Sequence, residues 1–242
     1  MIAVDETPDA LTQQRLQALA HFQAGFLANA SHELRRPMTQ IISLHQLILE
    51  GLCDDPEEEQ QFLRQSFEAT QRVLENLDLL IGISKLGVGR VEPKLQILHL
   101  QDVFAQLQMQ TQILAENRNC RLTVQMATED TLKSDIDWLV QALRLLIEGA
   151  ITAQSEQIQV YGQGQSDQLQ IFVITDSATA AWQAAPAPDQ PQVPQAVGFS
   201  PGYCQQLAAQ ILMALGGDLA PSAEAPQQFI LTLPVPDQPQ AA

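Results

Sequence analysis

Basic residues are scarce in this sequence. Only 12 lysines and arginines stand against 28 aspartates and glutamates, which gives the 242 residues a formal net charge of -16. A surface of this sign repels phosphate backbones and anionic lipids, so we expect no nucleic-acid partner and no acidic membrane partner. Cysteines are also few, and Cys53, Cys120 and Cys204 are scattered and odd in number. They provide neither a disulfide framework nor the spacing of a zinc site, which favours a reduced, cytoplasmic protein.

Long apolar runs are missing as well. No stretch approaches the ~20 consecutive apolar residues that span a bilayer, and the N-terminal residues do not resemble a signal peptide. Only about 20 residues precede the first helical motif, which is too few for a sensor domain. We therefore expect no membrane span, and either an input signal that comes from a soluble partner or no input at all.

The most informative stretch is residues 26–42, FLANASHELRRPMTQII. Its apolar residues recur at the spacing of a helix that packs against other helices. This stripe consists of Leu27, Leu34, Met38, Ile41 and Ile48. His32 lies about 200° around the helix from Leu34, so its ring is expected to face solvent. Glu33 is close enough in sequence to orient the ring, and Arg35 and Arg36 place positive charge where a phosphate would need it.

Residues 31–37, SHELRRP, resemble the phospho-acceptor box of sensor histidine kinases, S-H-E-L-R-T-P, at every position except Arg36. The resemblance implies that His32 is the nucleophile, Glu33 the base that orients it, and Arg35 a charge partner. Arg36 replaces the Thr or Asn that would position a water molecule, which predicts weak phosphatase activity. The alternative is an exposed histidine on an ordinary helical hairpin.

Two long helices are predicted around this box. Thr7 is typical of an N-cap and Pro8 of a first helical position, and the helical pattern continues to about Glu50. After a turn at residues 51–56, a second helix runs to about Ser84. Its apolar stripe consists of Leu63, Phe67, Leu74, Leu77 and Ile81. One hairpin cannot cover these stripes, so we predict a homodimer with a four-helix bundle; the alternative is a monomeric hairpin folded onto a second domain.

The second half of the chain mixes strands and helices. The expected strands are residues 98–100, 121–126, 158–161, 169–174 and 228–233, and the expected helices are residues 102–116, 134–153 and 203–215. This order predicts an α/β sandwich with helices on one face of a mixed sheet. It also resembles the ATP-binding domain of the same kinases. The predicted domains are therefore a dimerisation and phosphotransfer hairpin, 1–86, an ATP-binding-like domain, 95–236, and a tail, 237–242.

The resemblance implies three nucleotide motifs, and the first lies on the helix at 134–153. The family holds magnesium with an asparagine and has a lysine nearby, whereas here Glu148 and Ile151 stand at those positions. A carboxylate can bind Mg²⁺ as a hard ligand, although it also repels a triphosphate. Glu148 is thus the candidate metal ligand, and the alternative is an exposed acid on an amphipathic helix.

The second motif follows the strand at 169–174. Asp176 matches the aspartate that accepts the adenine amino group, but Ala178 and Ala180 replace both glycines of the family's D-x-G-x-G turn. Glycine is used where φ is positive or a ligand comes close, so two methyl groups narrow this site.

The third motif is residues 198–204, GFSPGYC, where the family has G-x-G-L-G-L. Gly198 and Gly202 remain as candidate nucleotide-binding residues, whereas Ser200 replaces the middle glycine and Pro201 removes one amide donor. Residues 182–197, rich in Ala, Pro and Gln, take the place of the family's mobile ATP lid; a plain disordered loop is the alternative.

Three hypotheses follow. In the first, His32 exchanges a phosphoryl group with an aspartate of a response-regulator receiver domain, and the donor is a partner kinase or the regulator itself. In the second, the protein is an active sensor histidine kinase with an atypical ATP and Mg²⁺ site. In the third, it is a non-enzymatic module that binds a response regulator. The substitutions fall on residues that would touch phosphate and metal while the apolar positions remain, a pattern typical of a pseudokinase, which favours the first hypothesis.

Overall fold

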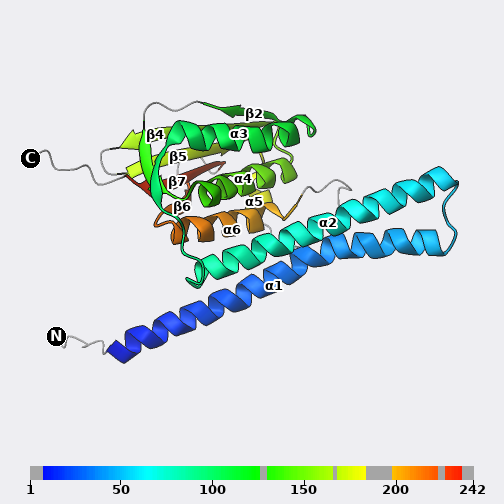
Figure 1. The fold of residues 1–242 in the computed structure, drawn as a ribbon, viewed down its shortest axis with the longest axis horizontal. Helices are drawn as coiled ribbons and strands as arrows, with labels where there is room; N and C mark the ends of the chain where they lie inside the picture. The colour runs from blue at the N-terminus through cyan, green and yellow to red at the C-terminus, as the bar shows by residue number, and fades with distance from the viewer. Residues whose placement is uncertain (1–7, 126–129, 166–167, 184–197, 223–226, 236–242) are drawn as a thin grey trace, which may run out of the picture. The chain divides into compact units, whose positions relative to one another are not determined.

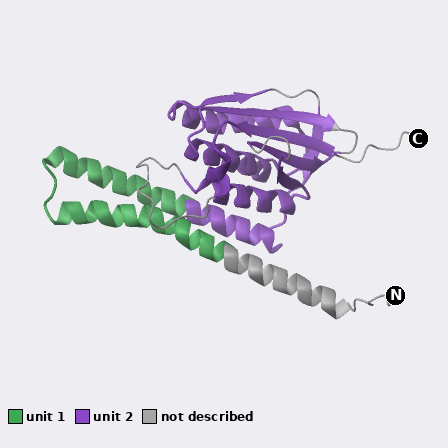
Figure 2. Ribbon diagram, turned by 180° about the vertical axis from the view of Figure 1, so that it is seen from behind, with its two compact units in different colours: residues 1–75 green, residues 76–242 purple. Residues whose placement is uncertain are grey.

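The computed structural model describes residues 8–125, 130–165, 168–183, 198–222 and 227–235, with side chains described from residue 26 onward. The chain divides into two compact units, residues 1–75 and 76–242 (Figure 2). The domain limits expected from the sequence, 1–86 and 95–236, remain predictions. Within the described residues, no helix combines the length and the apolar composition that crossing a bilayer requires.

The first unit is a helical hairpin. Helix α1 spans Pro8–Leu49, and helix α2 begins at Pro56 and runs to Gly87, so that its last turns belong to the second unit (Figure 1). The turn between them uses a glycine with positive φ, Gly51 at 65°. Asp55 Oδ1 then accepts a hydrogen bond from Glu58 N, and Glu58 Oε2 accepts one from Asp54 N, both at 2.7 Å. These side chains satisfy free amides at the start of α2, which fixes where the helix begins.

The second unit is built on a mixed sheet of five strands in the order β2-β4-β5-β7-β6. Strand β2, Arg121–Val124, is parallel to β4, Gln157–Gln165, and the remaining pairs are antiparallel. The other members are β5, Gln168–Thr175, β6, Asp218–Pro221, and β7, Gln228–Pro234. A separate antiparallel pair joins β1, Gln96–His99, to β3, Thr131–Ser134.

Three helices cover one face of this sheet: α3, Leu100–Glu116, α4, Ile136–Thr152, and α6, Pro201–Ala214 (Figure 1). Alternate residues of the strands point towards them and form the core. Among these are Ile158, Val160, Leu169, Ile171, Val173, Phe229, Leu231 and Leu233, all buried. The predicted fold class, a helical hairpin followed by an α/β sandwich with helices on one face of a mixed sheet, is confirmed.

Three short elements do not appear among the predicted ones. They are β3, β6 and α5, a helix of 5 residues at Thr179–Gln183. Each is too short to show a period, and β6 contains Pro221, which counts against a strand except at a sheet edge. The prediction that residues 182–197 form a lid or loop is wrong at its start, because Trp182 and Gln183 are helical. Residues 184–197 and the tail at 237–242 lie outside the described residues.

Candidate functional site

His32 lies on the solvent side of α1. Its side chain is exposed, and the helix around it is continuous in spite of Pro37. Two hydroxyl groups near it bond to the helix backbone: Ser31 Oγ donates to Leu27 O at 2.7 Å, and Thr39 Oγ1 donates to Arg35 O at 2.9 Å. The nucleophile predicted from the sequence is thus accessible to a large partner.

Glu33, unlike His32, is turned away from solvent. Its side chain is only 1% exposed, and its Oε2 lies 4.0 Å from Nη1 of Arg36 one turn further along α1. Successive residues of an α-helix point about 100° apart, which lets one neighbour be buried while the other is solvated. Arg36, the one departure from the phospho-acceptor box, therefore partners the buried carboxylate, whereas Arg35 is exposed.

His45, further along α1, has a structural partner. His45 Nε2 and Ser66 Oγ are 2.8 Å apart, and this hydrogen bond links α1 to α2 within the first unit. Ser66 is buried, so the bond satisfies its hydroxyl.

An apolar surface, which we call the hairpin stripe, is left open along both helices of the hairpin. Leu27 is 64% exposed and Phe67 63%. The hairpin stripe consists of Leu27, Met38, Ile42 and Leu49 on α1 with Leu63, Phe67, Leu74 and Ile81 on α2. The sequence assigned Leu27 and Met38 to a packed seam, and in the single chain they are exposed. Exposed apolar residues that recur at helical spacing are typical of a surface that contacts a partner.

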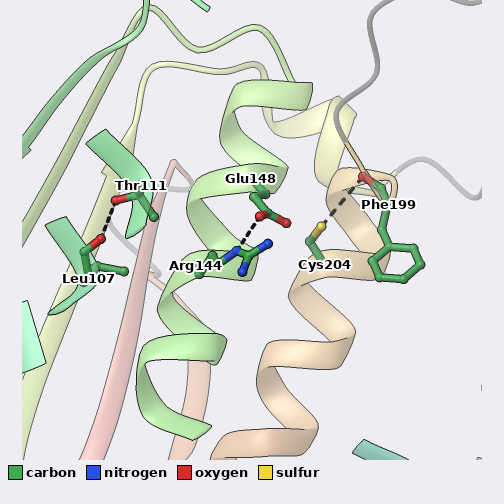
Figure 3. A network of polar contacts seen from close by, with 6 residues as sticks. All are labelled: Leu107, Thr111, Arg144, Glu148, Phe199 and Cys204. Atoms are coloured by element: carbon green, nitrogen blue, oxygen red, sulfur yellow. Dashed lines mark hydrogen bonds and ion pairs between the residues drawn. The ribbon is translucent and has the colours of Figure 1, made fainter. Parts of the chain in front are cut away.

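The first nucleotide motif lies on α4, which begins at Asp135. Asp135 is the N-cap, and its Oδ1 accepts hydrogen bonds from the amides of Asp137 and Trp138. Further along α4, Glu148 Oε1 accepts a hydrogen bond from Arg144 Nε at 2.7 Å, and the two side chains are 13% and 42% exposed (Figure 3). Ile151 is buried. The candidate metal ligand thus already has a cationic partner.

No group of three or more His, Cys, Asp or Glu residues within the described ranges could hold a metal ion. Gly198, from the third motif, lies near Glu148, since a Cβ added to Gly198 would be 3.8 Å from Glu148 Oε2. The structure therefore brings the candidate metal residue close to the first glycine of the third motif.

Asp176, from the second motif, supports the sheet. Its Oδ1 accepts hydrogen bonds from Glu156 N at 3.0 Å and Gln157 N at 3.2 Å. These amides lie at the start of β4, so the carboxylate joins the end of β5 to the beginning of its neighbour. Asp176 also lies close enough to Cys120 for its negative charge to matter. Burial, with this charge as a smaller contribution, raises the pKa of the Cys120 thiol to about 11.

The third motif forms the start of α6. Ser200 is at the N-cap position and Pro201 at the first helical position. Gly202 lies within the first turn. Cys204 Sγ donates a weak hydrogen bond to Phe199 O at 3.7 Å (Figure 3). Pro201 has no amide hydrogen to donate, and Gly202 is helical. This segment is therefore an ordinary helix start.

Trp182 is the residue that sequence analysis missed. It is 6% exposed, and its ring centroid lies 4.6 Å from that of Phe229 on β7. Its Nε1 donates a hydrogen bond to Ser177 Oγ at 2.8 Å. A Cβ added to Gly149 on α4 would lie 2.9 Å from its Cη2 atom. The signal that could have found it is this glycine in an otherwise apolar helix, which provides room for a large ring.

Both units are similar to parts of known proteins. Residues 22–89 match the family model of the His Kinase A (phospho-acceptor) domain. Sensor protein VanSB of Enterococcus faecalis is 25% identical over 162 residues, covering 66% of this chain and 36% of that protein. Sensor protein kinase WalK of Staphylococcus aureus is 39% identical over 61 residues, covering 25% of this chain and 15% of that protein. The chain thus spans about a third or less of the length of these relatives.

Among solved structures, histidine kinase AdeS of Acinetobacter baumannii has a TM-score of 0.63 at 16% identity, covering 85% of this chain and 98% of that chain. Full-length ShkA in complex with AMPPNP has a TM-score of 0.56 at 15% identity, covering 90% of this chain and 45% of that chain. At these identities the likeness shows the fold alone. Residues 22–89 are thus similar to a His Kinase A phospho-acceptor domain, and the chain has the fold of solved histidine kinases, a helical hairpin followed by an α/β domain.

Proposed function

We propose that this chain is a two-component signalling protein in which His32 carries a phosphoryl group and exchanges it with an aspartate of a response-regulator receiver domain. The observation that carries this proposal is the exposed His32 on α1, within a phospho-acceptor box that lies inside the matched residues 22–89. An aspartyl phosphate is a large, protein-borne donor, and an imidazole on the open face of a helix can reach it.

The transfer itself needs little from the protein besides position and charge. A ring nitrogen of His32 attacks the phosphorus of the aspartyl phosphate, the bond between phosphorus and the carboxylate oxygen breaks, and the aspartate leaves as a carboxylate. Arg35, exposed three residues after His32, offsets charge on the phosphoryl oxygens. Glu33 contributes from the buried side of the helix, where its pairing with Arg36 holds the carboxylate in place and supports the segment that presents His32.

We further infer that Mg-ATP is not the phosphoryl donor, because the residues at the nucleotide motifs do not fit it. Glu148 is paired with Arg144, and buried Ile151 replaces the lysine. Asp176 uses one carboxylate oxygen for two backbone amides. A metal-bound triphosphate needs oxygen ligands and free amide donors, and these positions offer few of either. The donor is then the phosphorylated regulator or a partner kinase.

A homodimer completes the proposed function. The hairpin stripe, defined above by Leu27 and Phe67 and their neighbours at helical spacing, suits the centre of a four-helix bundle formed by two copies. Burying it against a second hairpin supports association through the hydrophobic effect.

The experiment that tests the proposal supplies a response regulator carrying labelled phosphate. Acid-labile label is expected on the wild-type chain and is expected to be lost in His32→Gln, while His45→Gln, whose histidine bonds to Ser66, keeps it. Failure of the wild type to take label from any cognate regulator, or retention of label in His32→Gln, would overturn the proposal. Labelled ATP is expected to give no label; label on His32 from ATP would contradict only the inference about the donor.

A further inference from the structure

The indole of Trp182 lies where the three predicted nucleotide motifs meet. Gly149 follows Glu148 of the first motif, Ser177 follows Asp176 of the second, and Cys204 ends the third. A Cβ added to Gly149 would lie 2.9 Å from Trp182 Cη2 and 3.1 Å from Cys204 Cβ. The indole of Trp182 and the Cβ atom of Cys204 on α6 therefore both lie close to Gly149 of α4, which has no side chain.

Several contacts hold the indole in this place. Nε1 donates to Ser177 Oγ at 2.8 Å, and Ser177 Oγ is in turn 2.7 Å from Thr175 Oγ1. On its other side the ring packs at 57° to Phe229, with centroids 4.6 Å apart. A buried tryptophan that has both a partner for its N–H group and aromatic packing is a fixed part of the interior. Any side chain at position 149 would collide with it, so Gly149 and Trp182 fit each other.

We propose that the indole of Trp182 fills the space that an adenine base would need, so that the second unit is closed to purine nucleotides by its own side chain. The inference shares one premise with the proposed function, namely that Glu148, Asp176 and Gly198 mark the positions of a nucleotide site. Indole and adenine are both flat bicyclic rings. Protein interiors are packed without ring-sized voids, so the two cannot share this space.

Displacing the indole would be costly for a nucleotide. The ring would lose its hydrogen bond to Ser177 and its packing against Phe229, and the apolar surface of Trp182 would be exposed to water. The nucleotide would also bring its phosphates towards Glu148, whose Oε2 lies near Gly198. The pairing of Glu148 with Arg144 uses the cation that could otherwise attract them.

The intrinsic fluorescence of the protein tests this proposal directly. The chain has 2 tryptophans, so Trp138→Phe leaves Trp182 as the single indole. Its emission is expected to be that of a buried ring, with weak quenching by acrylamide. Both properties are expected to stay unchanged on adding Mg-ATP up to ~1 mM, the upper end of ordinary KM values. A saturable red shift, or stronger quenching with ATP, would overturn the proposal.

A second variant tests the shape of the space. Trp182→Ala should leave an apolar cavity that free indole can enter, as apolar cavities in other proteins accept ring ligands. Free indole is expected to raise the melting temperature of Trp182→Ala but not that of Trp182→Phe, whose ring still fills part of the site. An equal effect on both variants would contradict a defined ring site. If Trp182→Ala does not fold, the fluorescence of Trp138→Phe decides the matter.

The two proposals fail separately. Displacement of the indole by ATP would end the inference about Trp182 and leave the transfer of phosphate from a regulator to His32 untouched. Absence of that transfer would end the proposed function, while a Trp182 signal insensitive to ATP would still support a closed site.

Discussion

Arg144 Nε donates a hydrogen bond to Glu148 Oε1 at 2.7 Å, one turn apart on α4. The carboxylate of Glu148 is mostly buried, and the guanidinium of Arg144 is more exposed. The arginine therefore neutralises a charge that is partly removed from water. A partly buried carboxylate with a cationic partner has less need of a metal ion.

Replacing Arg144 with alanine is expected to lower the free energy of unfolding by about 1–2 kcal/mol, because Glu148 is left partly buried without its charged partner. The double variant Arg144→Ala with Glu148→Gln should recover part of this loss, and urea denaturation measures both. Mg²⁺ alone is expected to leave the unfolding midpoint of the wild type unchanged. A midpoint that rises with Mg²⁺ in the wild type but not in Glu148→Gln would instead identify Glu148 as a metal ligand.

Phe67→Glu is expected to weaken self-association by ~100-fold or more, because a carboxylate buried in the hairpin stripe of a bundle has no partner. Light scattering across a range of protein concentrations measures the shift from dimer to monomer. Met109→Glu is the matched control, since Met109 on α3 is also largely exposed but lies outside the hairpin. If both variants remain dimeric, the hairpin stripe is not the dimer interface.

Arg36→Thr is expected to increase dephosphorylation of the response regulator by ~10-fold or more, because a hydroxyl at this position can orient an attacking water molecule. The change also removes the partner of buried Glu33, so stability is measured alongside the rate of phosphate release. Arg36→Ala is the matched control, because it removes the same ion pair with Glu33 but supplies no hydroxyl. A wild-type rate already as fast as that of Arg36→Thr would contradict the prediction.

Cys120 predicts a pH dependence of stability. Its pKa is raised from 9.0 to about 11 by burial, with a further contribution from Asp176. As pH rises above 9.0, the unfolded chain loses the thiol proton while the folded chain keeps it, so this contribution to stability falls until about pH 11. Urea midpoints of the wild type are therefore expected to fall more steeply over this range than those of Cys120→Ala. Parallel curves would show that the thiol does not ionise differently in the two states.

The long elements of this fold could be predicted from sequence because each carries its own local signal. Asp135 is a good N-cap, and the strands around Leu169 and Leu231 alternate in polarity. Burial that depends on distant partners could not be predicted in this way. Trp182 stands next to a stretch rich in Ala and Pro, and nothing local indicates that it packs against Gly149 on another helix.

The site was only partly predictable for a related reason. The helical spacing of the apolar residues predicts that Leu27 and Met38 lie on the packed face of α1. The buried face of α1 instead includes Ala30 and Glu33, a small residue and a charged one. His32 is exposed, as the sequence predicts, and its role as phosphoryl acceptor stays a prediction. The partner of Glu33 became visible only when Arg36 was placed one turn away.

Asp176 has a structural role that is independent of any nucleotide. Its carboxylate fixes the start of β4 through the amides of Glu156 and Gln157, whatever happens at the nucleotide position beside it. The sheet therefore needs Asp176 whether or not a ligand binds beside it, whereas Ala178 and Ala180 stand where the resemblance implies glycines. The presence of Asp176 is therefore evidence of an intact sheet. A nucleotide site in this fold has to be judged from residues that have no structural role of their own.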